Sequence, residues 1–155
     1  SPKMDPFKPE EEKLNQLLKQ KGREKIDPLR KRMQEVMMEH GSVFRNEEGL
    51  KKGMDEIRSL RDRHKDIEVA NKGKQFNYEL TEAIELGHQL NIAETILLSA
   101  LHRRESRGAH FREDFPTRAD QSYLKHTLIF QTSKGREVRY KPVKITRFQP
   151  EARVY

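Results

Sequence analysis

A cationic stretch in the last third of the chain holds the residues best suited to recognition. The candidate interface residues are Arg104, Glu105, Arg107, His110, Arg112, Arg118, Lys125 and His126. Four of them are arginines within one short loop, and guanidinium groups make forked hydrogen bonds to carboxylates and carbonyls. We therefore predict that this loop docks against another protein surface, and we name no residue as catalytic, cofactor-binding or metal-binding.

Residues of the same loop support catalysis less well than they support docking. Ser106 and His110 lie four positions apart, a spacing that does not define a nucleophile and its base. Glu113 and Asp114 follow Arg112 directly, so ion pairing explains these acids more simply than acid–base chemistry does.

Metal, thiol and nucleotide chemistry find little support elsewhere in the chain. There is no Cys, which excludes disulfides, zinc–thiolate sites and iron–sulfur ligation. Glu85 and His88 have the Glu-x-x-His spacing of di-iron bundles, but such a site needs two copies of the motif and the chain has one. The eight glycines are scattered and form neither a GxGxxG nor a Walker pattern.

The composition predicts a narrow core and an asymmetric charge. The chain is 33% hydrophobic and 37% charged, as expected of helices packed side by side. Of the net charge of +7, residues 1–104 carry +2 and residues 105–155 carry +5. In the last third we therefore expect either an acidic or phosphate-bearing partner or a plain solvated surface.

The location of the chain is also constrained by its apolar residues. No apolar run suits a membrane span or a signal peptide, which favours an intracellular chain. The start at Ser1 suggests a piece of a longer protein.

Apolar spacing predicts four helices. The expected helices cover residues 10–20, 27–40 and 77–104, and another starts at Asn46 with an apolar face that reaches Leu60. Gly22 and Gly41 are the expected stops of the first two. Asp27 before Pro28 predicts a capped helix start, and Asn46 predicts another. The fourth segment is apolar on two faces, which places it in the middle of a bundle.

The remainder of the chain predicts a loop and a hairpin. Apolar and polar residues alternate over 125–132, which predicts a strand. Residues 133–135 are expected to form a three-residue turn, and residues 137–140 the return strand. The predicted fold is mainly α, an antiparallel three- to four-helix bundle followed by a basic loop and a small C-terminal β-hairpin. We expect a linker over 1–9, the bundle over 10–104, and a loop and β tail over 105–155 packed in the same domain.

Several short motifs, in order along the chain, resemble one protein family. They are GSVFR at 41–45, FNYEL at 76–80, RESRGAHFREDFP at 104–116, YLKHT at 123–127 and KPVKITRF at 141–148. Together they are similar to the C-terminal region of succinate dehydrogenase and fumarate reductase flavoprotein subunits. Ala109 and residues 112–116 favour this branch over the related aspartate oxidases.

This resemblance implies a parent oxidoreductase that interconverts succinate and fumarate through FAD, in electron transport and the tricarboxylic acid cycle. The FAD-binding and catalytic residues of such proteins precede this region, so we expect no cofactor in the chain itself. The implied partners are the flavin-binding domain of the same subunit and the iron–sulfur subunit, and the implied location is cytoplasmic, peripheral to the membrane through partner subunits. The expected role is domain docking and subunit assembly, without activity in the isolated chain.

Two other functions stay open on the sequence. The basic tail, with Tyr140, Phe148 and Tyr155, would suit a free-standing module that binds nucleic acid or an acidic partner, although no nucleic-acid motif is present. Glu85 and His88 would support a metal-dependent helical-bundle enzyme.

Overall fold

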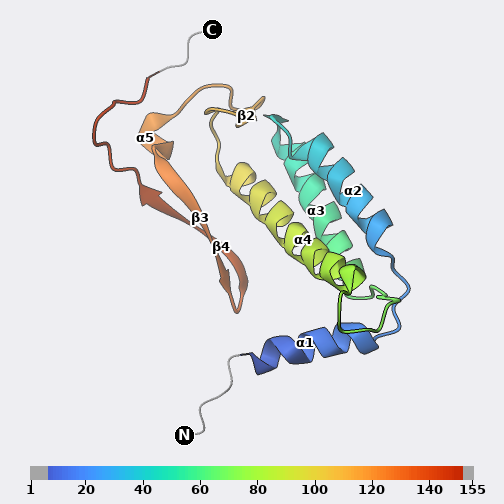
Figure 1. The fold of residues 1–155 in the computed structure, drawn as a ribbon. Helices are drawn as coiled ribbons and strands as arrows, with labels where there is room; N and C mark the ends of the chain where they lie inside the picture. The colour runs from blue at the N-terminus through green and yellow to red at the C-terminus, as the bar shows by residue number, and fades with distance from the viewer. Residues whose placement is uncertain (1–6, 152–155) are drawn as a thin grey trace, which may run out of the picture.

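Three long helices form the body of the protein (Figure 1). The computed structural model describes residues 7–151, and its helical part consists of α1 (Lys8–Lys19), α2 (Ile26–His40), α3 (Glu47–His64) and α4 (Tyr78–His102). Helices α2, α3 and α4 lie side by side, and α1 crosses the end of this bundle. The predicted class, a helical bundle followed by a hairpin, is confirmed.

The apolar core belongs to the helices and to one connector. Leu29, Leu50 and Leu90, from the three bundle helices, are fully buried. Burial of such side chains supplies most of the free energy that favours folding. Ile67 and Val69 are also fully buried, although the connector between α3 and α4 reads as polar in sequence.

The helix ends confirm some predicted caps and correct others. Asn46 caps α3, since its side-chain oxygen accepts a hydrogen bond from the backbone nitrogen of Gly49 at 2.9 Å, and Gly41 ends α2. The predicted cap at Asp27 is wrong because α2 begins at Ile26, with Lys25 in the capping position. Asp27 instead lies in the first turn, where its negative charge interacts favourably with the helix dipole.

Gly22 has a different role from the predicted helix stop. Helix α1 ends earlier, at Lys19, and Gly22 lies where two backbone segments meet. A β-carbon on Gly22 would stand 2.1 Å from the carbonyl oxygen of Asp66, so only glycine allows this approach. The expected linker over 1–9 lies mostly outside the described residues, and Lys8 and Pro9 belong to α1.

Two small sheets and a short helix complete the chain beyond the bundle. Strand β1 (Phe44–Arg45) pairs in parallel with β2 (Phe111–Arg112), and a short helix, α5 (Asp120–Tyr123), follows. The antiparallel hairpin consists of β3 (Lys125–Thr132) and β4 (Gly135–Pro142). In Figure 1 this hairpin runs beside α4, on the side away from α2.

The hairpin turn is tighter than predicted. Thr132 pairs with Gly135, so the turn contains two residues, Ser133 and Lys134, and the predicted three-residue turn is wrong. Gly135 has a φ of +112°, a conformation that L side chains rarely adopt and that favours glycine at this position. Strand β4 begins at Gly135 and ends at Pro142, extending the predicted 137–140 at both ends.

Candidate functional site

A buried carboxylate organises the arginine-rich loop, residues 103–119, which joins α4 to α5. Glu105 is fully buried, and Arg107 forks onto it with bonds of 2.9 Å from Nε and 3.0 Å from Nη2. The backbone nitrogen of Ala119 donates to the same carboxylate at 2.8 Å, and Arg103 donates from the end of α4. Burial would raise the pKa of Glu105, but these hydrogen bonds outweigh it and lower the pKa, so the group stays ionised.

Arg112 closes the end of α4 from inside the protein. Its guanidinium is fully buried and forks onto Asp114, with both bonds 2.7 Å long. The same group donates to the carbonyl oxygens of Ala100 at 2.9 Å and Leu101 at 3.2 Å, in the last turn of the helix. A cation at this end interacts favourably with the helix dipole, so Arg112 joins the loop to the bundle.

His110 lies between two arginines as a neutral ring. Its Nδ1 accepts a hydrogen bond from Arg45 at 2.8 Å, and its Nε2 donates to the carbonyl oxygen of Arg103 at 3.0 Å. Burial, and then the nearby guanidinium groups of Arg45, Arg112 and Arg103, lower its pKa. The hydroxyl of Ser106 donates instead to the carbonyl oxygen of Phe115 at 2.9 Å. Both side chains are therefore occupied as structural groups and form no hydrogen bond to each other.

The remaining predicted interface residues lie nearer the surface. Arg104 is exposed and stands over the ring of Phe115, 5.9 Å from its centroid. Arg118 pairs with Asp120 at 2.9 Å. The ammonium group of Lys125 lies 3.9 Å from the ring centroid of Tyr140, a cation–π contact.

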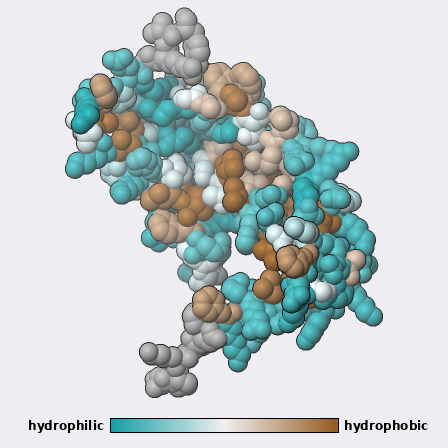
Figure 2. Space-filling view, viewed as in Figure 1, coloured by the Kyte–Doolittle hydropathy of each residue, from teal (hydrophilic) through white to brown (hydrophobic). Residues whose placement is uncertain are grey.

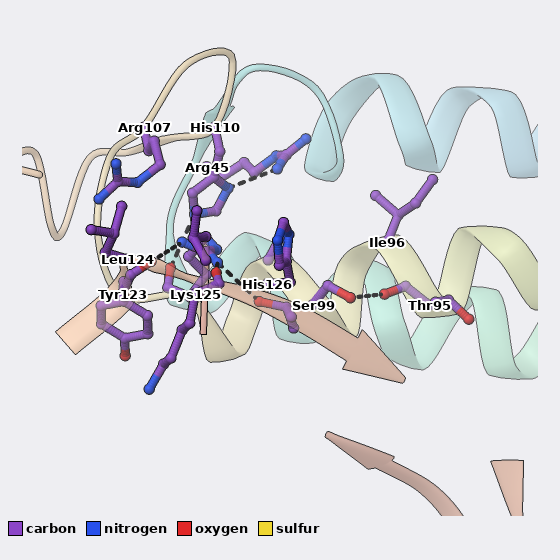
Figure 3. Close-up of a pocket in the computed structure, with 14 residues that line it drawn as sticks. Arg45, Thr95, Ile96, Ser99, Arg107, His110, Tyr123, Leu124, Lys125 and His126 are labelled. Carbon is purple, nitrogen blue, oxygen red and sulfur yellow. Dashed lines mark hydrogen bonds between the residues drawn. The ribbon is translucent and has the colours of Figure 1, made fainter. Parts of the chain in front are cut away.

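A pocket of about 580 Å³ brings four of the predicted residues together (Figure 3). Arg107, His110, Lys125 and His126 line it. Residues of α4, among them Ser99 and Ile96, also line it. The pocket does not include Arg104 or Arg118, and Glu105 and Arg112 lie in the protein interior. The eight candidates thus divide into two buried residues, four residues of the pocket wall, and Arg104 and Arg118 outside both.

The sequence prediction missed Arg45 and Arg103. Arg45 lies 65 positions before His110, and only the parallel pairing of β1 with β2 places the two side chains in contact. Arg103 is adjacent to the predicted loop, but nothing in its neighbours distinguishes it from Arg104. Its backbone partners, including the carbonyl oxygen of Tyr123 at 3.0 Å, depend on the position of α5.

A second ion cluster, on the side of α4 that faces the hairpin, was also missed. Glu94 is buried, and its carboxylate accepts a hydrogen bond from Arg58 at 3.0 Å. It also accepts hydrogen bonds from Arg61 and from Arg136, which lies on β4. Burial would raise the pKa of Glu94, but the three arginines lower it. Glu94 directly follows the buried Ala93 and precedes Leu97 by three, so an acid within an apolar helical pattern is the signal that would have found it.

The residues that would support metal chemistry lie apart from this site. Glu85 and His88 are both exposed on α4. Within the described part of the chain, no three His, Cys, Asp or Glu side chains are grouped so as to hold a metal ion. Across the same residues, none of the helices has the length and apolar character needed to cross a membrane.

The described residues also do not fit a dinucleotide. The two sheets have two strands each, and the parallel pair β1–β2 has only two residues per strand and no glycine-rich turn into a helix. Such a turn is what normally holds the pyrophosphate of FAD in proteins of the Rossmann type. We therefore derive no step of flavin chemistry from these residues.

The fold, a helical bundle followed by an arginine-rich loop and a hairpin, matches a known class of flavoprotein domains. A family model described as "Fumarate reductase flavoprotein C-term" matches residues 30–155, which is most of the chain. The chain therefore belongs to this family, the C-terminal domain of the succinate dehydrogenase and fumarate reductase flavoprotein subunit.

Individual relatives agree with this assignment. The fumarate reductase flavoprotein subunit of Haemophilus influenzae is 42% identical over 144 residues, covering 92% of this chain and 24% of that protein. The succinate dehydrogenase flavoprotein subunit of Rickettsia bellii is 41% identical over 133 residues, covering 85% of this chain and 22% of that protein. The chain thus spans about a quarter of the length of the relatives it matches.

Solved structures share the fold. A structure of Escherichia coli quinol fumarate reductase matches with a TM-score of 0.87 and 39% identity, covering 94% of this chain and 25% of that chain. Adenylylsulfate reductase from Archaeoglobus fulgidus matches with a TM-score of 0.66 at 19% identity, over 76% of this chain. The second likeness concerns the fold alone.

Proposed function

We propose that this domain serves docking and assembly within a flavoprotein subunit that interconverts succinate and fumarate through FAD. In this proposal the domain packs against the flavin-binding domain of the same subunit and helps to seat the iron–sulfur subunit. The relatives that support it are named as flavoprotein subunits of fumarate reductase and succinate dehydrogenase. Association with a membrane would be peripheral, through partner subunits, in line with the likeness to quinol fumarate reductase.

The internal pairing of the arginine-rich loop is the observation that carries this proposal. Glu105 and Arg112 are both fully buried, and each is held by forked ion pairs. The loop therefore has a defined shape before any partner binds, which reduces the entropy lost on docking. Arg104 and His126 are exposed on this framework, where they are available for contact.

The test uses the isolated chain and its complex. We expect the purified chain to be colourless, to contain no stoichiometric flavin and to lack succinate:dye reductase activity. We also expect it to co-purify with the preceding three quarters of the Haemophilus influenzae subunit when the two are co-expressed as separate polypeptides. Bound flavin in the isolated chain, or the absence of any complex, would contradict the proposal.

A further inference from the structure

A groove separates the hairpin from α4. The pocket of about 580 Å³ described above adjoins a second of about 760 Å³, and the two share Thr95 and Ile96 on α4. We call the two together the hairpin groove. It follows the helix beneath β3, and Figure 2 shows apolar side chains exposed among hydrophilic ones where the hairpin lies beside the bundle.

The floor of the hairpin groove is apolar and poorly covered. Ile92 is 58% exposed and Ile96 is 40% exposed, on a helix whose other large aliphatic residues are mostly buried. Ile129, on β3, lines the same groove from the hairpin side. Covering these three side chains would remove apolar surface from water, which favours the binding of an apolar partner.

The charged residues of the hairpin groove all have the same sign. Among the residues that the structure describes, no Asp or Glu lines either pocket, although the chain has 25 acidic residues. Arg61, Lys65 and Arg136 line the second pocket. Next to it, the carboxylate of Glu94 is shared by Arg58, Arg61 and Arg136. Asp55 also pairs with Arg58 and Asp62 pairs with Lys65, so these four cations exceed the three acids by one charge. This field attracts carboxylates.

We propose that the hairpin groove binds an acidic segment, with apolar side chains between its carboxylates, from the part of the flavoprotein subunit that lies outside this chain. The inference rests on the proposed function and specifies the surface at which docking occurs. The isoleucines fit aliphatic side chains, and the cationic ends fit carboxylates. A nucleic-acid strand fits less well because bases stack on large aromatic rings. Among the described residues, neither Phe nor Trp lines either pocket, and the tyrosine there, Tyr123, already contacts Lys125.

Co-expression with the preceding three quarters of the Haemophilus influenzae subunit tests the apolar floor. Ile92→Glu places a negative charge in the groove, and Met38→Glu is its control, because Met38 is 74% exposed on α2. We expect at least a tenfold loss of co-purified complex for Ile92→Glu and no change for Met38→Glu, with circular dichroism showing both variants folded.

A matched pair of lysines tests the charge. Lys65, in the groove, and Lys13, on α1, each form an ion pair of 2.6 Å with an acid three positions earlier. Lys65→Glu should weaken the complex, whereas Lys13→Glu should leave it unchanged.

The results separate the two ideas. If the wild-type chain forms the complex, and Ile92→Glu and Lys65→Glu both leave its yield unchanged, the groove is not the docking surface, although docking itself stands. The same conclusion follows if the control variants weaken the complex equally. No wild-type complex would overturn docking itself, and the groove assignment with it. A gel shift with single-stranded RNA that Ile92→Glu abolishes would also overturn the proposed occupant.

Discussion

The helical bundle and the segment that follows it are held together by different forces. All the buried apolar residues of the described chain lie between Leu18 and Ala100. Beyond Ala100, the buried residues are Glu105 and Arg112, both charged. The bundle is thus stabilised by apolar burial, whereas the loop is stabilised by directional ion pairs and hydrogen bonds. A loop built in this way has a specific shape with little apolar core, as the proposed docking role would require.

The largest expected effect comes from the bundle. Leu97→Ala removes a fully buried side chain from α4 and should lower the free energy of unfolding by about 2–5 kcal/mol, because a cavity is added to the lost burial. Urea denaturation followed by circular dichroism measures it. If Leu97→Ala lowered the free energy of unfolding no more than a substitution at an exposed position, such as Ile92→Ala, the bundle would not be the main source of stability.

A smaller and local effect is expected in the loop. Glu105→Gln removes the charge that Arg103 and Arg107 share, and should destabilise the loop by about 2 kcal/mol. The backbone N–H of Ala119, which donates to Glu105, should exchange with solvent faster, while amides within α3 keep their protection. Glu113→Gln, at an exposed acid of the same loop, is the control, because the glutamine oxygen can still accept the hydrogen bond from Asn46. Equal acceleration in α3 would show that the two regions unfold as one unit.

Acid should distinguish the same two regions in the unaltered protein. The pKa values of Glu94 and Glu105 are lowered in the fold from an ordinary value of 4.5. Their contribution is therefore fully present above about pH 4.5 and is lost as the pH falls through the folded pKa values. Hydrogen exchange below pH 4.5 should show the loop and hairpin opening before the bundle, because the α3–α4 contact that Glu94 makes through Arg58 and Arg61 is supported by apolar burial. Simultaneous opening of all three would contradict the division.

The smallest effect concerns the junction between the regions. Asn46 caps α3 and also donates to Glu113 of the loop at 2.8 Å, so Asn46→Ala should cost about 1 kcal/mol. Asp27→Ala, at an acid that does not cap its helix, should cost less. Thermal unfolding of the two variants checks the difference, and a larger loss for Asp27→Ala would contradict this account of the caps.

Local sequence signals predicted the helices and β3 well. Helix spacing and the cap at Asn46 depend on neighbours within a few positions, and the structure confirms them. Buried Ile67 and Val69 were missed because two apolar residues among polar ones show no helical period. Gly22 was misread because its neighbour, Asp66, is distant in sequence.

The candidate site was predicted by composition but not by geometry. The arginines of the loop were found from their density, yet density does not separate the buried Arg112 from the exposed Arg104. That separation depends on the carbonyl groups at the end of α4, which only the fold brings to Arg112. The Arg45–His110 contact likewise required the parallel pairing of β1 with β2.

The parallel pairing of β1 with β2 also constrains the order of folding. Phe44 pairs with Phe111, so this contact closes a loop that contains α3 and α4 in full. Closing so long a loop of unfolded chain costs entropy before any contact compensates for it, whereas an assembled helix pair already holds the two ends near each other. We therefore expect the arginine-rich loop to become ordered after the bundle during refolding, as a late kinetic step.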